Sequence, residues 1–187
     1  MKTAELAARL DAFFCLSAYP PADFAEIEEF SREAGIPLVR CATPQFMQRH
    51  NGLMLENADW VERVNTLVFP SDQVLDEARG RANGRPTLVF THHPMDFETS
   101  GRGLIPISEA TLQRLRDARS PSTRLSFYSS HAPLDCHDSV STSRALARAA
   151  GVQVDGVCAG YHGGYAGVIG TINETTLPAF VERFRAC

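Results

Sequence analysis

Apolar and polar positions along this chain follow two periods, which together predict helices alternating with short strands. Apolar residues at helical spacing predict the helices, and short runs of β-branched and aromatic residues predict the strands. The predicted helices cover residues 3–14, 23–34, 71–79, 108–119, 139–150 and 176–185, and the predicted strands cover residues 64–69, 87–90 and 124–128. Residues 40–60 follow neither period and are predicted to be irregular. This order of elements predicts an α/β fold, in which helices flank a sheet.

Single residues mark several of the predicted boundaries. Ser71 is predicted to cap the helix that follows it, and Asp138 or Ser139 to cap the helix that Gly151 ends. Asn83-Gly84 predicts a turn that leads into the next strand.

Two clusters of polar residues directly follow predicted strands. His92 and His93 follow one strand, and His131 and Asp135 follow the next strand along the chain. A helix is predicted between these strands, so the segment predicts a βαβ unit whose two strands are parallel. Both clusters then lie at the carboxyl edge of the sheet, where ligands bind in open α/β folds.

Imidazoles and a carboxylate at one sheet edge predict a metal site for zinc, manganese or iron. The alternative is that the histidines are structural or exposed. Successive strand residues point to opposite faces, so His92 and His93 can share a site only if the backbone turns, which Pro94 favours. Without such a turn, the two histidines would bind two different metals, or one would bind a metal and the other would contact one of its ligands. His131 is a candidate proton carrier, because imidazole titrates near neutrality.

A glycine-rich stretch covers residues 156–170, with Tyr161-His162-Gly163-Gly164-Tyr165 at its centre. It lacks the Gly-Lys-Ser/Thr of a phosphate loop and the Gly-x-Gly-x-x-Gly of a dinucleotide site. We predict a hairpin or loop that needs positive φ angles. The alternative is a loop that lets substrate approach the backbone, with His162 as an extra polar group.

Composition narrows the class of protein. The length of 187 residues predicts a single domain over residues 1–187, or one domain plus a fragment of another. The 44% hydrophobic and 21% charged residues are ordinary for a globular chain. A net charge of −4 and a single lysine argue against a nucleic-acid partner. No apolar run reaches the length of a membrane span, and Glu5, Arg9 and Asp11 argue against a signal peptide.

Five cysteines are scattered along the chain without a Cys-x-x-Cys pair. The odd number and the spacing predict reduced thiols in a cytoplasmic protein. Cys136 adjoins Asp135 and is either a soft metal ligand or a small buried residue.

The motifs resemble those of the Nif-three-like family, many of whose members are named type-2 GTP cyclohydrolase I. The resemblance spans residues 45–185 and rests on Asn51-Gly52-Leu53, Thr91-His92-His93-Pro94, His131-Ala132-Pro133-Leu134-Asp135, and the segment 163–170. It implies a Nif-three-like layered sheet with flanking helices and a parallel βαβ core.

The resemblance also implies a function. The two histidines and the aspartate of the family help to hold a dinuclear centre, which implies His92, His93 and Asp135 as metal ligands and His131 as an acid/base or outer group. A complete protein would hold two divalent ions and assemble as a homo-oligomer. The implied activity is metal-dependent hydrolysis of a small molecule such as a nucleotide. The alternative is a non-catalytic, metal-binding or regulatory interaction protein.

One element of the family is missing from this sequence. The family completes its metal site with a His-x-x-x-Glu element in a second, related half. After His137 the only histidine is His162, and the only glutamates are Glu174 and Glu182, at other spacings. We therefore expect the chain to correspond to the first half of the family, to bind metal weakly and to show little cyclohydrolase activity. An α/β half should also expose an apolar face, which predicts self-association.

Overall fold

The computed structural model describes residues 1–19, 42–94, 96–98, 103–105, 108–117, 124–173 and 175–185. The predicted helix at residues 23–34 lies outside them. The chain divides into two compact units, Met1–His131 and Ala132–Cys187, and each is described by itself.

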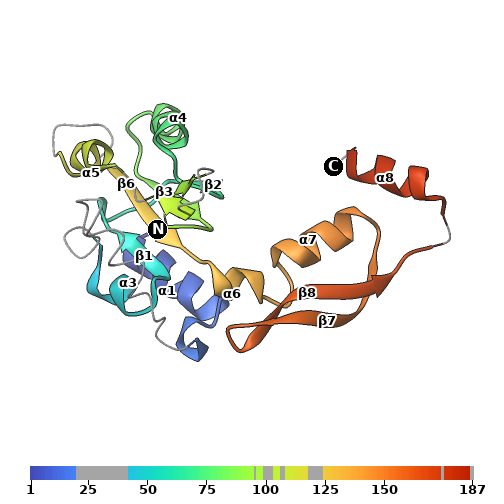
Figure 1. The fold of residues 1–187 in the computed structure, drawn as a ribbon. Helices are drawn as coiled ribbons and strands as arrows, with labels where there is room; N and C mark the ends of the chain where they lie inside the picture. The colour runs from blue at the N-terminus through green and yellow to red at the C-terminus, as the bar shows by residue number, and fades with distance from the viewer. Residues whose placement is uncertain are drawn as a thin grey trace. The chain divides into compact units, whose positions relative to one another are not determined.

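A four-stranded sheet forms the centre of the first unit (Figure 1). Its strands in spatial order are β1 (Gly52–Leu55), β6 (Leu125–Ser129), β3 (Thr87–Thr91) and β2 (Arg63–Leu67). β2, β3 and β6 are parallel, and β1 pairs antiparallel with β6. The predicted parallel pairing of the two strands that precede the histidine motifs is thus confirmed.

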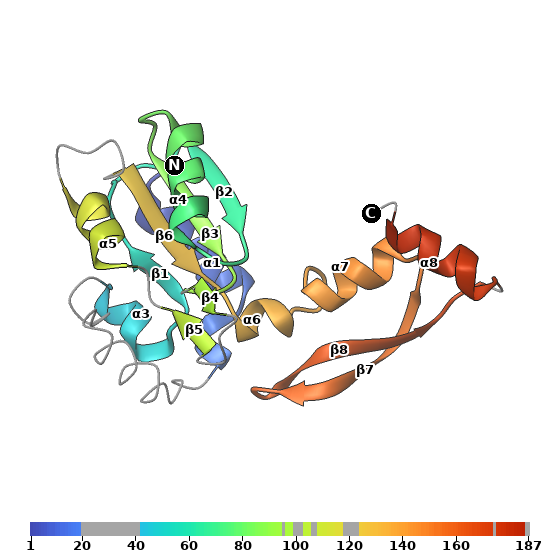
Figure 2. The same cartoon turned by 45° about the horizontal axis from the view of Figure 1, so that its top comes forward.

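The two central strands are apolar because both of their faces are covered. On one face, Val89 and Phe127 are fully buried among side chains of the helices α3 (Pro44–Arg49), α4 (Asp72–Ala82) and α5 (Glu109–Arg116). On the other face, Phe90 stacks on Phe14, which directly follows α1 (Thr3–Phe13). Figure 2 shows the same elements with α4 in front of the sheet. The first unit is therefore a layered α/β fold, as predicted.

The helices of this unit begin where the sequence supplies a side-chain oxygen. The hydroxyl of Ser71 accepts a hydrogen bond from the backbone N–H of Val74, which confirms the predicted cap of α4. Ser108 caps α5 in the same way. Asn83 ends α4 in the left-handed conformation (φ 50°), and Gly84 (φ 74°) continues the predicted turn.

The prediction of irregular structure for residues 40–60 is wrong, because this segment contains α3 and β1. α3 has only six residues, with Thr43 as its N-cap and Pro44 at its first position. β1 has four residues, all buried, so it shows no alternation. Elements this short carry almost no periodic signal, and β1 depends on its pairing with β6. A small hairpin of β4 (Asp96–Glu98) and β5 (Gly103–Ile105) was also not predicted.

The second unit consists of α6 (Ala132–Asp135), α7 (Thr142–Ala149), β7 (Gln153–Tyr161), β8 (Gly164–Thr171) and α8 (Leu177–Arg185). β7 and β8 pair antiparallel, which confirms the predicted hairpin. His162 (φ 48°) and Gly163 (φ 84°) make the turn, as expected of a two-residue loop with two positive φ angles.

The predicted cap of α7 at Asp138 or Ser139 is wrong. The N-cap is Ser141, whose hydroxyl accepts a hydrogen bond from the backbone N–H of Arg144. A turn occupies residues 138–140 and delays the helix. No helix among the described residues is long and apolar enough to span a membrane.

Candidate metal centre

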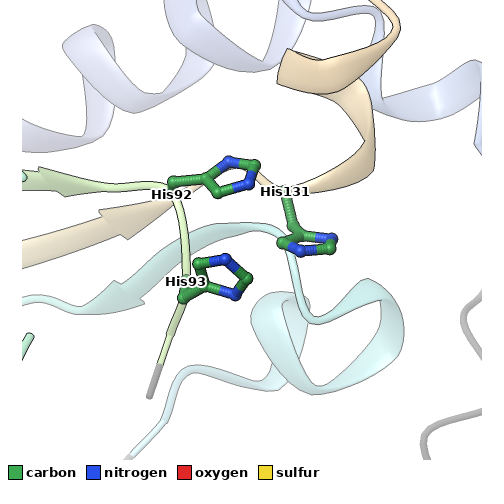
Figure 3. A group of neighbouring side chains, drawn as sticks. All are labelled: His92, His93 and His131. Carbon is green, nitrogen blue, oxygen red and sulfur yellow. The ribbon is translucent and has the colours of Figure 1, made fainter. Parts of the chain in front are cut away.

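Three imidazoles lie together at the carboxyl ends of β3 and β6. One nitrogen from each of His92, His93 and His131 lies within 4.8 Å of the other two (Figure 3). The ring centroids of neighbouring imidazoles are 4.5 to 4.6 Å apart. The structure thus brings together three of the four site residues expected from the sequence.

The sheet holds the backbone of this site beyond the ends of its strands. Thr91 pairs with Ser129 at the last position of the β3–β6 register, and the N–H of Ser130 then donates to the Thr91 carbonyl at 3.1 Å. On the other side of β3, the N–H of His92 donates to the Leu67 carbonyl at 3.1 Å. The histidines therefore extend from a framework paired on both sides.

A bend after β3 allows successive histidines to share the site. The hydroxyl of Thr91 donates to the His93 carbonyl at 2.6 Å, and the hydroxyl of Ser129 donates to the His92 carbonyl at 3.3 Å. Thr91 and Ser129 are both fully buried, so these short-range bonds are shielded from water. The backbone turn that His92 and His93 need in order to share one site is therefore present.

Asn51 holds the third histidine from the neighbouring strand. Its side-chain oxygen accepts a hydrogen bond from the N–H of His131 at 2.7 Å, and its amide donates to the Arg49 carbonyl at 3.0 Å. β1 runs antiparallel to β6, so its first residues lie at the edge where β6 ends. In the sequence, Asn51 is part of the family motif Asn51-Gly52-Leu53, but no role could be assigned to it because β1 was not predicted.

The surroundings of His93 favour its neutral imidazole. Burial lowers the pKa of His93 from 6.5 to about 4, and repulsion by His131 and His92 acts in the same direction. Neutral imidazole is the form that binds metal. Nδ1 of His92 lies 3.2 Å from the Ser130 carbonyl, which can only accept. That contact places the proton on Nδ1 and leaves Nε2 for a metal, the common outer partnership of a ligating histidine.

The donor set fits a metal ion. Nδ1 of His93 is buried and has no hydrogen-bond partner in the described parts of the chain. Metal–nitrogen bonds of about 2.0–2.1 Å place two nitrogens of a tetrahedral site about 3.4 Å apart, and the three nitrogens here lie within 4.8 Å of one another. Phe69 stacks on His93 at 4.3 Å between centroids and restricts its ring. Zinc and iron are among the ions that imidazole ligands suit.

Residues 44–186 match the sequence profile of the Duf34/NIF3 (NGG1p interacting factor 3) family. The chain belongs to this family. Over 136 residues it is 30% identical to a GTP cyclohydrolase 1 type 2 homolog from Deinococcus radiodurans, and the match covers 72% of this chain and 48% of that protein. The resemblance noted in the sequence is thereby confirmed.

Solved structures similar to this Duf34/NIF3 protein support the fold. One is the structural-genomics protein ybgI, of unknown function, with a TM-score of 0.53 and 22% identity over 84% of this chain and 50% of that one. Another is TTHA1606 from Thermus thermophilus, with a TM-score of 0.51 and 19% identity over 83% of this chain and 51% of that one. The chain spans about half the length of these relatives.

The remaining residues singled out in the sequence lie in the second unit of this Duf34/NIF3 protein. Asp135 ends α6, and its carboxylate accepts a hydrogen bond from the Thr142 hydroxyl at 3.4 Å. The thiol of Cys136 donates to the Tyr161 carbonyl at 3.3 Å, and His162 occupies the hairpin turn. Metal ligation by Asp135 stays a prediction.

Proposed function

We propose that this protein binds a divalent metal ion, namely zinc, manganese or iron, through His92 and His93, with Asp135 supplying a carboxylate oxygen. The cluster of three imidazoles carries the proposal. His131 serves as a further nitrogen ligand or as the proton carrier of the site. The lowered pKa of His93 keeps its nitrogen unprotonated at neutral pH, ready to coordinate.

We propose further that the site hydrolyses a small molecule. A bound divalent ion with an open position supplies a more acidic water and polarises a carbonyl or phosphoryl oxygen. The residues of this chain would position that chemistry: the bend after Thr91 orients His92 and His93, and Asn51 fixes the backbone of His131. From there, the His131 imidazole can take up or release a proton. The name of the Deinococcus relative makes GTP the first substrate to test.

Metal binding is tested by titrating EDTA-treated protein with zinc and with manganese in a calorimeter, and by elemental analysis. His92→Ala and His93→Ala should each lower the affinity about 10–100-fold, since a missing ligand or outer partner typically costs this much. His162→Asn is the matched control, because that histidine lies in the hairpin turn, where asparagine tolerates a positive φ. Equal affinities in all four proteins would refute the proposed ligands.

A second candidate function is metal binding without catalysis. It requires only the cluster of three imidazoles and no group that acts on a substrate. Turnover of GTP by metal-loaded protein distinguishes the candidates. Ring opening that disappears in His131→Ala supports the hydrolase, whereas stoichiometric metal without turnover supports the non-catalytic protein.

We also propose that the protein is a cytoplasmic homo-oligomer. Three cysteines of the described chain, Cys15, Cys136 and Cys158, are free thiols. Large apolar side chains are exposed in the second unit, including Ile169 at 57% and Leu177 at 74%. An apolar surface of this kind is typical of a contact between chains. Light scattering should show a mass above 20.5 kDa, and Ile169→Lys should lower it; a wild-type monomer at high concentration would contradict the proposal.

A further inference from the structure

A small cavity with a mixed polar and apolar lining lies beside α1 and α3 in the first unit. Its volume is about 210 Å³, enough for one small polar group but less than ligand pockets usually offer, roughly 300–1,000 Å³. Its lining residues are Asp11, Ala12, Leu16, Ser17, Gln45, Arg49 and Asn51. The size therefore suits one end of a substrate.

Arg49 supplies the positive charge of this cavity. Its Nε is buried and has no hydrogen-bond partner in the described parts of the chain. A buried N–H without a partner is costly, and a guanidinium offers five N–H donors in a planar fork that matches carboxylate and phosphate oxygens. Gln45 lies one turn earlier on α3 and lines the same cavity. The cavity thus has a guanidinium group in its lining, which can donate to a ligand that brings acceptors.

Asp11 is the opposing charge, and its oxygens are engaged. One accepts a hydrogen bond from the Tyr128 hydroxyl at 2.9 Å, and the other accepts one from the Gln45 amide at 3.0 Å. Tyr128 is fully buried, so this arrangement holds α1 against the sheet. The bonds disperse the charge of Asp11 but do not remove it.

Asn51 connects the cavity with the histidines. It lines the cavity, and its side-chain oxygen accepts the hydrogen bond from the backbone N–H of His131 at 2.7 Å. Asn51 is thus the residue that the cavity shares with the framework of the histidines.

We propose that this cavity is a substrate subsite in which Arg49 binds an oxyanion, the carboxylate or phosphate end of a small substrate whose reacting part lies at the histidines. The assignment of a substrate rests on the proposed function, whereas binding of an oxyanion by Arg49 does not require the metal. The positive charge of Arg49 sets the preference for an anion, and the charge of Asp11 in the same lining weakens it.

The test is a titration of metal-free protein, labelled with ¹⁵N-histidine, with sodium phosphate and, separately, with sodium acetate at constant ionic strength. The backbone amide of His131 is the reporter, because its acceptor Asn51 lines the cavity. We expect a saturable shift with at least one anion. Phosphate alone would identify a phosphate end, and acetate alone a carboxylate end.

Variants locate the binding. Arg49→Gln should weaken it at least about tenfold, since hydrogen bonds to a charged group are worth about 1.5–3 kcal/mol. Arg81→Gln removes the same charge from an exposed helix position and should change nothing. Asp11→Asn keeps an acceptor for Tyr128 and should strengthen binding about two- to sixfold. No saturable shift with either anion, or equal affinity in Arg49→Gln, would overturn the subsite. Because no metal is present, either result is independent of the metal-binding test.

Discussion

Acid should destabilise the first unit through His93. The pKa of this imidazole falls from 6.5 to about 4 on folding, because burial and the neighbouring imidazoles disfavour its charged form. Between these two pH values the unfolded chain binds a proton that the folded chain does not. Stability is therefore complete above about pH 6.5 and is lost as the pH falls toward 4.

The size of the loss follows from the same values. A fall from 6.5 to about 4 corresponds to at most about 3 kcal/mol. His93 is partly exposed, so screening by solvent reduces this to about 1–2 kcal/mol. That amount is a large fraction of the usual stability of a domain, about 5–15 kcal/mol.

The assay is urea unfolding of EDTA-treated protein at pH 7.0 and pH 4.5, followed by tryptophan fluorescence. Trp60 is the only tryptophan and belongs to the first unit, so the signal reports the unit that contains the histidines. His93→Gln should lose about 1–2 kcal/mol less than the wild type between the two pH values. His162→Asn should lose as much as the wild type. An equal loss in His93→Gln would show that folding does not hold His93 neutral, and would refute the reasoning.

Two further predictions concern residues around the proposed metal. Asn51→Leu should lower zinc affinity about tenfold, because it frees the His131 backbone. Asn51→Asp keeps the acceptor and should retain most of the affinity. Calorimetry that finds the two variants alike would exclude this positioning role. Asp135→Asn should weaken zinc binding about 10–100-fold, while Asp138→Asn, at a fully exposed carboxylate, should have no effect; unchanged affinity in Asp135→Asn would remove it from the ligand set.

The histidine site could be predicted from the sequence because local patterns determine most of it. The runs before His92 and His131 are apolar over most of their length, and a helix separates them, so parallel pairing follows from chain topology. Their polar ends then meet at one edge of the sheet. The strands and the helix were each inferred from residues that are close together in the chain. Their parallel pairing was inferred from the general rule for strand–helix–strand connections.

Asn51 and the Arg49 cavity could not be predicted in the same way. Both depend on β1, a four-residue strand whose partner β6 lies some seventy residues later. The bond from His131 to Asn51 and the bond from Tyr128 to Asp11 also join residues far apart in the chain. No period in the sequence records such a pairing, so only the structure reveals which distant residues support the site.

The cluster of three imidazoles itself indicates a function, because without a bound cation it lowers the stability of the fold. Three imidazoles placed side by side repel one another when charged, and Nδ1 of His93 is buried without a hydrogen-bond partner in the described chain. Apolar side chains at these positions would pack without either cost. Departures of this kind from a stable arrangement concentrate at functional sites. A cation bound by the neutral imidazoles would offset both costs and stabilise the folded state in proportion to its affinity. The pH range in which His93 resists protonation is then also the range in which the folded site is ready to bind metal.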